Sequence, residues 1–274
     1  MATDTAKALT LSDLRNQRAQ GEKIACLTAY DASFAALEDR AGVDVVLVGD
    51  SLGMVIHGLT TTVPVTMDDM VYHTRVTARG LARAFLMADM PFLSYATREQ
   101  ALMNAGRLMQ EGGAKMVKLE GGEIQADIVH YLTERGVPVC GHIGLKPQLV
   151  HKTGGFKVQG REEAAARAML RDAEALQEAG ADMLLLECVP SALGAEITRK
   201  ARVPVIGIGA GPDVDGQILV LYDILGIPTG IGGGRRPRFV RNFMEGAASV
   251  EAAVQAYVRA VKDRSYPAPE HCFG

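Results

Sequence analysis

The chain alternates short runs of apolar, often β-branched residues with longer stretches in which apolar residues recur at helical spacing. The short runs cover residues 23–29, 44–49, 84–89, 115–120, 137–142, 182–187, 203–209 and 218–225. A strand buried on both faces of a parallel sheet has this pattern. Strands in such alternation with helices predict an α/β fold, the (β/α)8 TIM barrel. An open doubly wound sheet is disfavoured because Thr28-Ala29-Tyr30-Asp31, after the first run, lacks the glycines of a nucleotide-binding loop.

The intervening stretches carry helix start and stop signals. We expect the first helix to begin near Leu11, with Ser12 as its cap, and to close the bottom of the barrel. The spacing of a capping box occurs twice, in Thr66 with Asp69 and in Thr97 with Gln100. Further helices are predicted at 31–40, 126–134, 161–179, 190–201 and, as a long last helix, 238–262.

Composition narrows the class of protein. The 274 residues fit one barrel domain, 1–274, with an N-terminal capping helix, and 48% hydrophobic residues exclude a disordered or fibrous chain. A net charge of −3 with dispersed signs argues against nucleic acid and anionic membranes as partners, so small molecules are expected. The cysteines show no pairing pattern, and the N-terminus resembles no signal peptide. With no apolar stretch of membrane-spanning length, these features predict a cytoplasmic protein.

Five polar side chains each close a different apolar run: Asp50, Asp89, Glu120, His142 and Glu187. If the strands are parallel, all of them emerge at one rim of the barrel. The hard oxygens of Asp50, Asp89 and Glu120 suit Mg²⁺. Burying these carboxylates together without a cation costs several kcal/mol, roughly. Lys118 lies on the same strand face as Glu120, so it is expected to neutralise a carboxylate or to bind that of a substrate.

Each of these residues also has a simpler reading. A single acid after a strand is often only a helix cap, and His142 alone fits a buried core histidine. A lysine at a strand edge can extend its charge into solvent. The helix-cap interpretation applies to Glu187 too, but its apolar neighbours would raise its pKa toward that of a useful general base.

Several glycine-containing segments remain ambiguous. Loops 51–65 and 143–160 are long enough to act as lids, or they are surface insertions or subunit contacts. Gly207-Ile208-Gly209-Ala210-Gly211 suits either a phosphate site or close packing at the barrel mouth. Gly230-Ile231-Gly232-Gly233-Gly234-Arg235-Arg236 suits either an anionic cofactor tail or a neighbouring subunit.

Specific motifs carry a family resemblance that spans roughly residues 9–259. They are Thr28-Ala29-Tyr30-Asp31, Val48-Gly49-Asp50-Ser51-Leu52-Gly53, Lys118-Leu119-Glu120-Gly121-Gly122, Gly141-His142-Ile143-Gly144-Leu145, Phe156-Lys157-Val158-Gln159-Gly160-Arg161, Leu186-Glu187 with Val189-Pro190, and Ile206-Gly207-Ile208-Gly209-Ala210-Gly211. With these motifs the chain resembles the ketopantoate hydroxymethyltransferases.

The resemblance implies a TIM barrel that transfers the one-carbon unit of 5,10-methylenetetrahydrofolate to 3-methyl-2-oxobutanoate through a Mg²⁺-stabilised enolate. The product would be 2-dehydropantoate, on the route to pantothenate, and the assembly a homo-oligomer, by resemblance a decamer. The implied roles are Asp50, Asp89 and Glu120 as metal ligands, Asp50, Ser51, Asp89 and Lys118 as keto-acid contacts, and Glu187 as proton acceptor. We further hypothesise that His142 orients Glu187 or a substrate oxygen.

The match is not complete. The chain departs from the usual family residues at Lys146, Val214 and Tyr222, which affects the expected loop and folate contacts. A rival class is a Mg²⁺-dependent C–C lyase like isocitrate lyase or phosphoenolpyruvate mutase, but Cys140-Gly141-His142 lacks the paired lysines of that group's motif. A regulatory or scaffold barrel without catalysis is the non-enzyme alternative.

Overall fold

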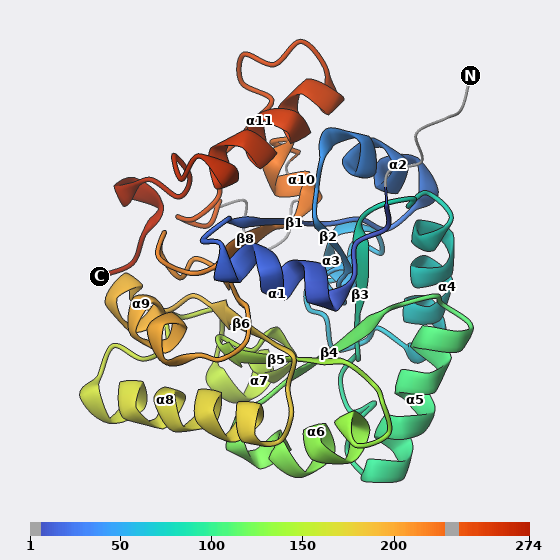
Figure 1. Cartoon of the computed structure of the whole chain (residues 1–274), viewed down its shortest axis with the longest axis vertical. Helices are drawn as coiled ribbons and strands as arrows, with labels where there is room; N and C mark the ends of the chain where they lie inside the picture. The colour runs from blue at the N-terminus through green and yellow to red at the C-terminus, as the bar shows by residue number, and fades with distance from the viewer. Residues whose placement is uncertain (1–6, 228–235) are drawn as a thin grey trace.

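The computed structural model describes residues 7–227 and 236–274 and contains a closed barrel of parallel strands in sequence order (Figure 1). The strands are Ile24–Thr28 (β1), Val45–Val48 (β2), Phe85–Asp89 (β3), Met116–Glu120 (β4), Val139–Gly144 (β5), Met183–Glu187 (β6), Val205–Ile208 (β7) and Gly216–Leu219 (β8). β1 pairs with both β2 and β8, which closes the sheet. The predicted (β/α)8 barrel is confirmed.

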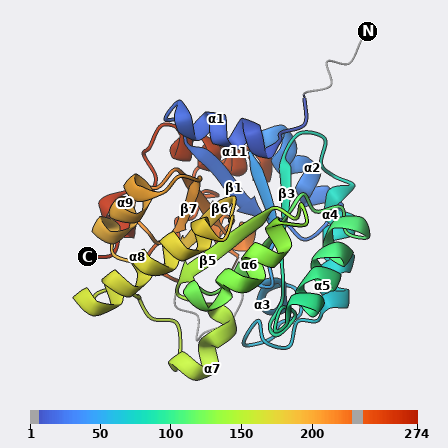
Figure 2. The same ribbon diagram turned by 60° about the horizontal axis from the view of Figure 1, so that its bottom comes forward.

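Helices surround the barrel, most of them along its outer face and a few at its ends (Figure 2). They are Leu11–Ala19 (α1), Ala32–Ala41 (α2), Leu52–Val55 (α3), Met67–Ala78 (α4), Arg98–Gln110 (α5), Ala126–Thr133 (α6), Val150–Thr153 (α7), Glu163–Glu178 (α8), Ser191–Lys200 (α9), Leu221–Ile224 (α10) and Val250–Lys262 (α11), with 3₁₀ turns at Glu123–Gln125, Pro147–Leu149 and Pro269–His271. Outward-facing strand residues and the inner faces of the helices form the larger apolar core. None of the described helices is both long and apolar enough to span a bilayer.

A second, smaller core fills the inside of the barrel. Alternate side chains along each strand point inward. The inward set is Ile24, Cys26, Val45, Leu47, Phe85, Met87, Met116, Cys140, Met183, Leu185, Ile206 and Ile218. Leu14 of α1 is fully buried against this set, so α1 closes one end of the barrel as predicted. Figure 2 shows α1 at that end, with α3 and α7 at the opposite one.

The first helix and the last strand differ from their predicted limits. Thr10, not Ser12, caps α1: its hydroxyl accepts from the backbone N–H of Asp13, whose side chain bonds back to Thr10. β8 spans Gly216–Leu219 instead of residues 218–225, and the apolar run after it is α10. The apolar pattern did not predict the start of β8, because Gly216 and Gln217 interrupt it. Glycine is needed there, since a Cβ would lie 2.4 Å from the carbonyl oxygen of Ile24.

The long helix predicted for residues 238–262 begins only at Val250. Ser249 caps it by accepting a hydrogen bond from the backbone N–H of Ala252. Before it, Gly246 adopts a left-handed φ of 79°, and Phe239 and Phe243 are buried without helical backbone. Both predicted N-caps are confirmed: Thr66 forms the full capping box, whereas Gln100 returns its side chain to Ala96 instead of Thr97.

Candidate active site

The strand alternation that fills the barrel with apolar residues ends in a polar layer. The inward-facing positions continue to the strand ends, where polar residues replace apolar ones. Two residues further along each strand, Asp89 follows Met87, Lys118 follows Met116 and Glu187 follows Leu185. All of the predicted site residues, Asp50, Ser51, Asp89, Lys118, Glu120, His142 and Glu187, line one cavity of about 830 Å³. The register brings neighbours together, because Asp89 pairs with Lys118 and Glu120 with His142 in adjacent strands.

Asp50 and Asp89 form a buried carboxylate pair at this layer. The backbone N–H of Asp50 donates to Oδ2 of Asp89 at 3.0 Å, and Nζ of Lys118 lies 2.6 Å from Oδ1 of Asp89. Burial, and then repulsion from Asp89, raises the pKa of Asp50 to about 7. Burial lowers the pKa of Lys118 on its own, but Asp89, Glu120 and Asp50 outweigh this and hold it above its ordinary value. Lys118 is therefore charged and compensates only part of the local negative charge.

His142 connects Lys118 to Glu187. Its Nδ1 lies 3.2 Å from Nζ of Lys118, and its Nε2 lies 3.2 Å from Oε2 of Glu187, close but not aligned as a hydrogen bond. Burial raises the pKa of Glu187 to about 8, and Lys118 offsets this only in part. The Glu187 side chain keeps 15% of its surface exposed, whereas His142 is 2% exposed. Glu187 is thus a basic carboxylate with access to the cavity.

Glu120 completes the set of acids. Its Oε2 accepts the backbone N–H of Gln148 at 3.1 Å, and its Oε1 lies 3.7 Å from Nδ1 of His142. Burial, followed by the charge of Asp50, raises the pKa of Glu120 well above its ordinary value. The site therefore holds more carboxylates than Lys118 neutralises.

The donor set fits a hard divalent cation. Oδ1 of Asp89 is buried and has no aligned hydrogen-bond partner among the described residues beyond its ionic contact with Nζ of Lys118 at 2.6 Å, so it keeps lone-pair capacity for a cation beside Asp50. In residues 7–227 and 236–274, no three His, Cys, Asp or Glu side chains stand close enough together to form a complete metal site. Mg²⁺ needs only one or two carboxylates, since it keeps several waters. Asp50 and Asp89 meet this requirement, and Glu120 stays a predicted ligand.

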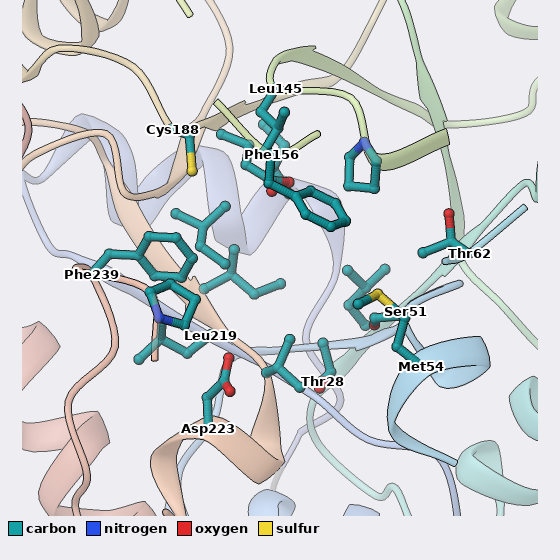
Figure 3. A pocket seen from close by; sticks show the side chains of 18 of the residues that line it. Thr28, Ser51, Met54, Thr62, Leu145, Phe156, Cys188, Leu219, Asp223 and Phe239 are labelled. Atoms are coloured by element: carbon teal, nitrogen blue, oxygen red, sulfur yellow. The ribbon is translucent and has the colours of Figure 1, made fainter. Parts of the chain in front are cut away.

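Both long loops contribute to the cavity. The first provides Ser51, Met54, Val55 and Thr62, and the second provides Leu145, Pro147, Phe156, Lys157 and Val158. Figure 3 shows Phe156 and Phe239 facing the hollow from different segments, with Asp223 and Thr28 on the far side. These loops are therefore part of the site wall.

The glycines at the end of β7 serve close packing. A Cβ on Gly207 would lie 2.9 Å from Val214, and one on Gly209 would lie 2.8 Å from Phe239. This is the second of the two interpretations drawn from the sequence. The basic glycine segment falls, except for Arg236, on residues outside the described ones.

Some site residues gave no signal in the sequence. Gln148 is 4% exposed and contacts both Asp50 and Glu120, and Tyr95 bonds its side chain. Tyr30 contacts Oγ of Ser51 at 2.9 Å. Gln148 lies within a long loop and Tyr95 lies beyond its strand, so neither follows a periodic pattern, whereas Tyr30 belongs to the Thr28-Ala29-Tyr30-Asp31 motif. Only the position of Gln148 in a loop at the carboxyl ends of the strands pointed toward the site.

The departures from the family pattern lie around the cavity rather than among the acids. The charge of Lys146 helps to lower the pKa of His142, after burial and Lys118. Val214 is fully buried, and the Tyr222 ring packs 6.1 Å from that of Tyr30. None of the three is among the described residues that line the cavity.

The family model of ketopantoate hydroxymethyltransferase matches residues 8–269. The chain belongs to that family. Two curated proteins that are similar to this chain are named 3-methyl-2-oxobutanoate hydroxymethyltransferase. The one from Alkalilimnicola ehrlichii is 60% identical over 270 residues, covering 98% of this chain and 96% of the relative. The one from Nitrosococcus oceani is 60% identical over 259 residues, covering 94% and 97%. This ketopantoate hydroxymethyltransferase family member is an enzyme that transfers one-carbon groups.

Solved structures support the barrel fold. A phosphonopyruvate hydrolase superposes with a TM-score of 0.61 at 15% identity, covering 79% of this chain and 83% of that one. A 2,3-dimethylmalate lyase, described as a member of the PEP mutase/isocitrate lyase superfamily, gives 0.57 at 15% identity, with 76% and 80% covered. At this identity the likeness concerns the architecture alone.

Proposed function

We propose that the enzyme condenses 3-methyl-2-oxobutanoate with the one-carbon unit of 5,10-methylenetetrahydrofolate and with water, to give 2-dehydropantoate and tetrahydrofolate. The observation that carries this proposal is the placement of Glu187, whose pKa burial raises to about 8, beside His142 in the cavity that also holds Lys118. A carboxylate with a pKa near neutrality is suited to abstract a proton from carbon. The names of the relatives supply the keto acid.

The chain's own residues have separable roles in this proposal. Glu187 takes the proton from carbon three of the keto acid, and His142, whose Nε2 faces Glu187, orients Glu187 or a substrate oxygen. Lys118 balances the carboxylate of the substrate, and Ser51 contacts it as the resemblance implies. The buried layer beneath these groups excludes water, which strengthens each electrostatic contact.

A divalent cation belongs to the same proposal. Asp50 and Asp89 would hold Mg²⁺, and Glu120 would support it directly or through water. When bound, Mg²⁺ would supply Lewis-acid polarisation of the keto group and so acidify the neighbouring C–H. A related barrel, phosphonopyruvate hydrolase, has been solved in complex with oxalate and Mg²⁺, with a TM-score of 0.61. Excess carboxylate charge around Lys118 is the feature of this chain that supports a cation.

The outer cavity suits the larger co-substrate. Its volume of about 830 Å³ exceeds the need of a small keto acid. Aromatic rings of Phe156, Phe239 and Phe273 and the cations Arg236 and Arg238 line it. Aromatic surface complements a pterin, and cations complement the carboxylates of a glutamate tail.

The rival lyase chemistry has no support at Cys140. This residue belongs to the apolar layer inside the barrel, and burial raises the pKa of its thiol to about 12. It is therefore unsuited to act as an acid or nucleophile at the cavity.

We also propose a homo-oligomeric assembly and a cytoplasmic location, as the resemblance and the sequence predict.

Product analysis tests the proposed function. Purified enzyme is incubated with 3-methyl-2-oxobutanoate, 5,10-methylenetetrahydrofolate and Mg²⁺, and 2-dehydropantoate is quantified by mass spectrometry. A parallel reaction offers a 2-methylmalate-type substrate for C–C cleavage. The proposal expects the condensation product and no cleavage. Cleavage without condensation would replace the transferase by the lyase.

A further inference from the structure

Gln148 lies at the centre of the carboxylate layer, although it comes from the loop after β5. Its side chain is buried, and every polar atom of it has a partner. Nε2 donates to Oδ2 of Asp50 at 2.8 Å and to the carbonyl oxygen of Met90 at 3.0 Å, while Oε1 accepts from the hydroxyl of Tyr95 at 2.6 Å. The backbone N–H of the same residue donates to Oε2 of Glu120 at 3.1 Å. One residue thus contacts two of the candidate metal-binding acids.

These contacts fix the orientation of the amide. The carbonyl of Met90 can only accept a hydrogen bond, so the nitrogen of the Gln148 amide must face it. The Tyr95 hydroxyl has one hydrogen, and Oε1 of Gln148 at 2.6 Å is nearer than the carbonyl oxygen of Glu120 at 3.3 Å, so the hydroxyl donates to Oε1. It also accepts the backbone N–H of Glu120 at 3.3 Å. Tyr95 therefore prevents the amide from rotating, and Nε2 stays directed at Asp50.

The hydrogen bonds from Gln148 determine which carboxylate oxygens of Asp50 and Glu120 remain available to a cation. With Oδ2 of Asp50 and Oε2 of Glu120 engaged by Gln148, each carboxylate has a defined oxygen left for other partners. A carboxylate that already accepts a hydrogen bond also loses rotational freedom, so it reaches a cation at lower entropic cost. Among the described residues, only Gln148 hydrogen-bonds to the carboxylates of both Asp50 and Glu120, through its side chain and its backbone N–H respectively.

We propose that Gln148 is a positioning residue for the divalent cation: its side chain, locked by Tyr95, presents Asp50, and its backbone N–H presents Glu120. The inference rests on the cation of the proposed function and deepens it. It also assigns a function to the inner part of the loop 143–160. The outer part of that loop lines the cavity mouth through Phe156, so one segment contributes to both ends of the site.

Binding of Mn²⁺ to the metal-free protein, followed by electron paramagnetic resonance, tests this inference without turnover. The variants are Gln148→Met, which keeps the chain length and removes the amide, and Tyr95→Phe, which keeps the amide and removes its lock. Gln159→Met is the matched control, because its amide in the same loop bonds only the carbonyl of Lys157. Melting temperatures of the metal-free variants are measured beside binding.

Gln148→Met is expected to weaken Mn²⁺ binding by about 10–100-fold, the range typical of partners behind metal ligands. Tyr95→Phe is expected to weaken it less and to add little in the Gln148→Met background, since both act through one amide. Gln159→Met should bind Mn²⁺ like the wild type. If Gln148→Met does not fold, Tyr95→Phe carries the test alone.

Three outcomes decide the matter. Weakened binding that excess Mn²⁺ restores supports the inference. Wild-type affinity in both Gln148→Met and Tyr95→Phe overturns it and leaves the proposed function standing. If the wild type does not bind Mn²⁺, or if Asp50→Asn binds it equally well, the inference and the metal dependence of the proposed function both fall.

Discussion

Nε2 of His142 lies 3.2 Å from Oε2 of Glu187, and on the other side of the ring Nδ1 lies 3.2 Å from Nζ of Lys118. An ammonium only donates, so Nδ1 accepts. Burial, and then the charge of Lys118, lowers the pKa of His142 well below its ordinary value, so the ring is neutral. Its single N–H is therefore assigned to Nε2, which faces Glu187. Lys118 therefore sets the tautomer of the ring, and with it which atom of His142 faces the candidate base.

A first prediction concerns this tautomer. Gln in place of His142 offers an amide N–H near the position of Nε2, whereas Leu offers none. We expect His142→Gln to keep a larger share of kcat than His142→Leu, by roughly tenfold, about the value of one hydrogen bond to a charged group. Steady-state kinetics with the keto acid varied measure both variants. Equal losses in kcat would show that the ring does not act through its N–H.

A second prediction concerns the buried ion pair of Lys118 and Asp89. Lys118→Met removes the cation and leaves Asp89 and Glu120 uncompensated, which costs about 3–5 kcal/mol for a broken buried pair. We expect a melting temperature lower by roughly 10 °C, at about 2–4 °C per kcal/mol. Adding Asp89→Asn should recover part of the stability but not the activity. Calorimetry on the single and double variants decides this, and an unchanged melting temperature in Lys118→Met would contradict the ion pair.

A third prediction concerns Glu38, which lies outside the site on α2. It is fully buried, and neither carboxylate oxygen has a hydrogen-bond partner among the described residues. Burial, and to a lesser extent Asp31, raises its pKa well above the ordinary value. Below the unfolded pKa both states are protonated and nothing changes. Above it the unfolded chain releases the proton first, so stability falls by up to about 1.4 kcal/mol per pH unit.

Glu38→Gln cannot release that proton. The variant should therefore lose less stability between pH 5 and pH 8, roughly, than the wild type does. Thermal unfolding of both proteins across this range is the measurement. Glu174→Gln, at an exposed position of α8, is the control and should follow the wild type. Parallel pH profiles for wild type and Glu38→Gln would show that Glu38 ionises freely in the folded state.

The sequence predicted the architecture and the acids for a physical reason. Strands buried on both faces appear in the sequence as continuous apolar runs. The residue that ends such a run lies at the rim of the barrel, as Asp89, Glu120 and Glu187 do. The pattern failed where packing, not hydrophobicity, selects the residue. Gly216 is required by the nearby carbonyl of Ile24, and Gln148 by a set of polar contacts that come from distant segments.

A fourth prediction concerns the cation and is tested by ligand binding, without measuring turnover. Mg²⁺ together with 3-methyl-2-oxobutanoate should raise the melting temperature, and EDTA should remove the rise, because a ligand that binds only the folded state stabilises it by mass action. Asp50→Asn should show little of this shift, since it weakens the charge of the pair with Asp89. A rise that persists in EDTA would place the keto acid in the site without a metal.

The central claim is that Glu187 abstracts a proton from carbon three of the keto acid in a cation-dependent step. The direct measurement is exchange of that hydrogen in D₂O, followed by proton NMR with no one-carbon donor present. We expect exchange by the wild type with Mg²⁺, loss of exchange after metal removal, and a fall of at least about 100-fold in Glu187→Gln, as expected when a general base is removed. Exchange by Glu187→Gln at the wild-type rate would contradict the assignment of the base, and exchange unaffected by metal removal would contradict the role of the cation.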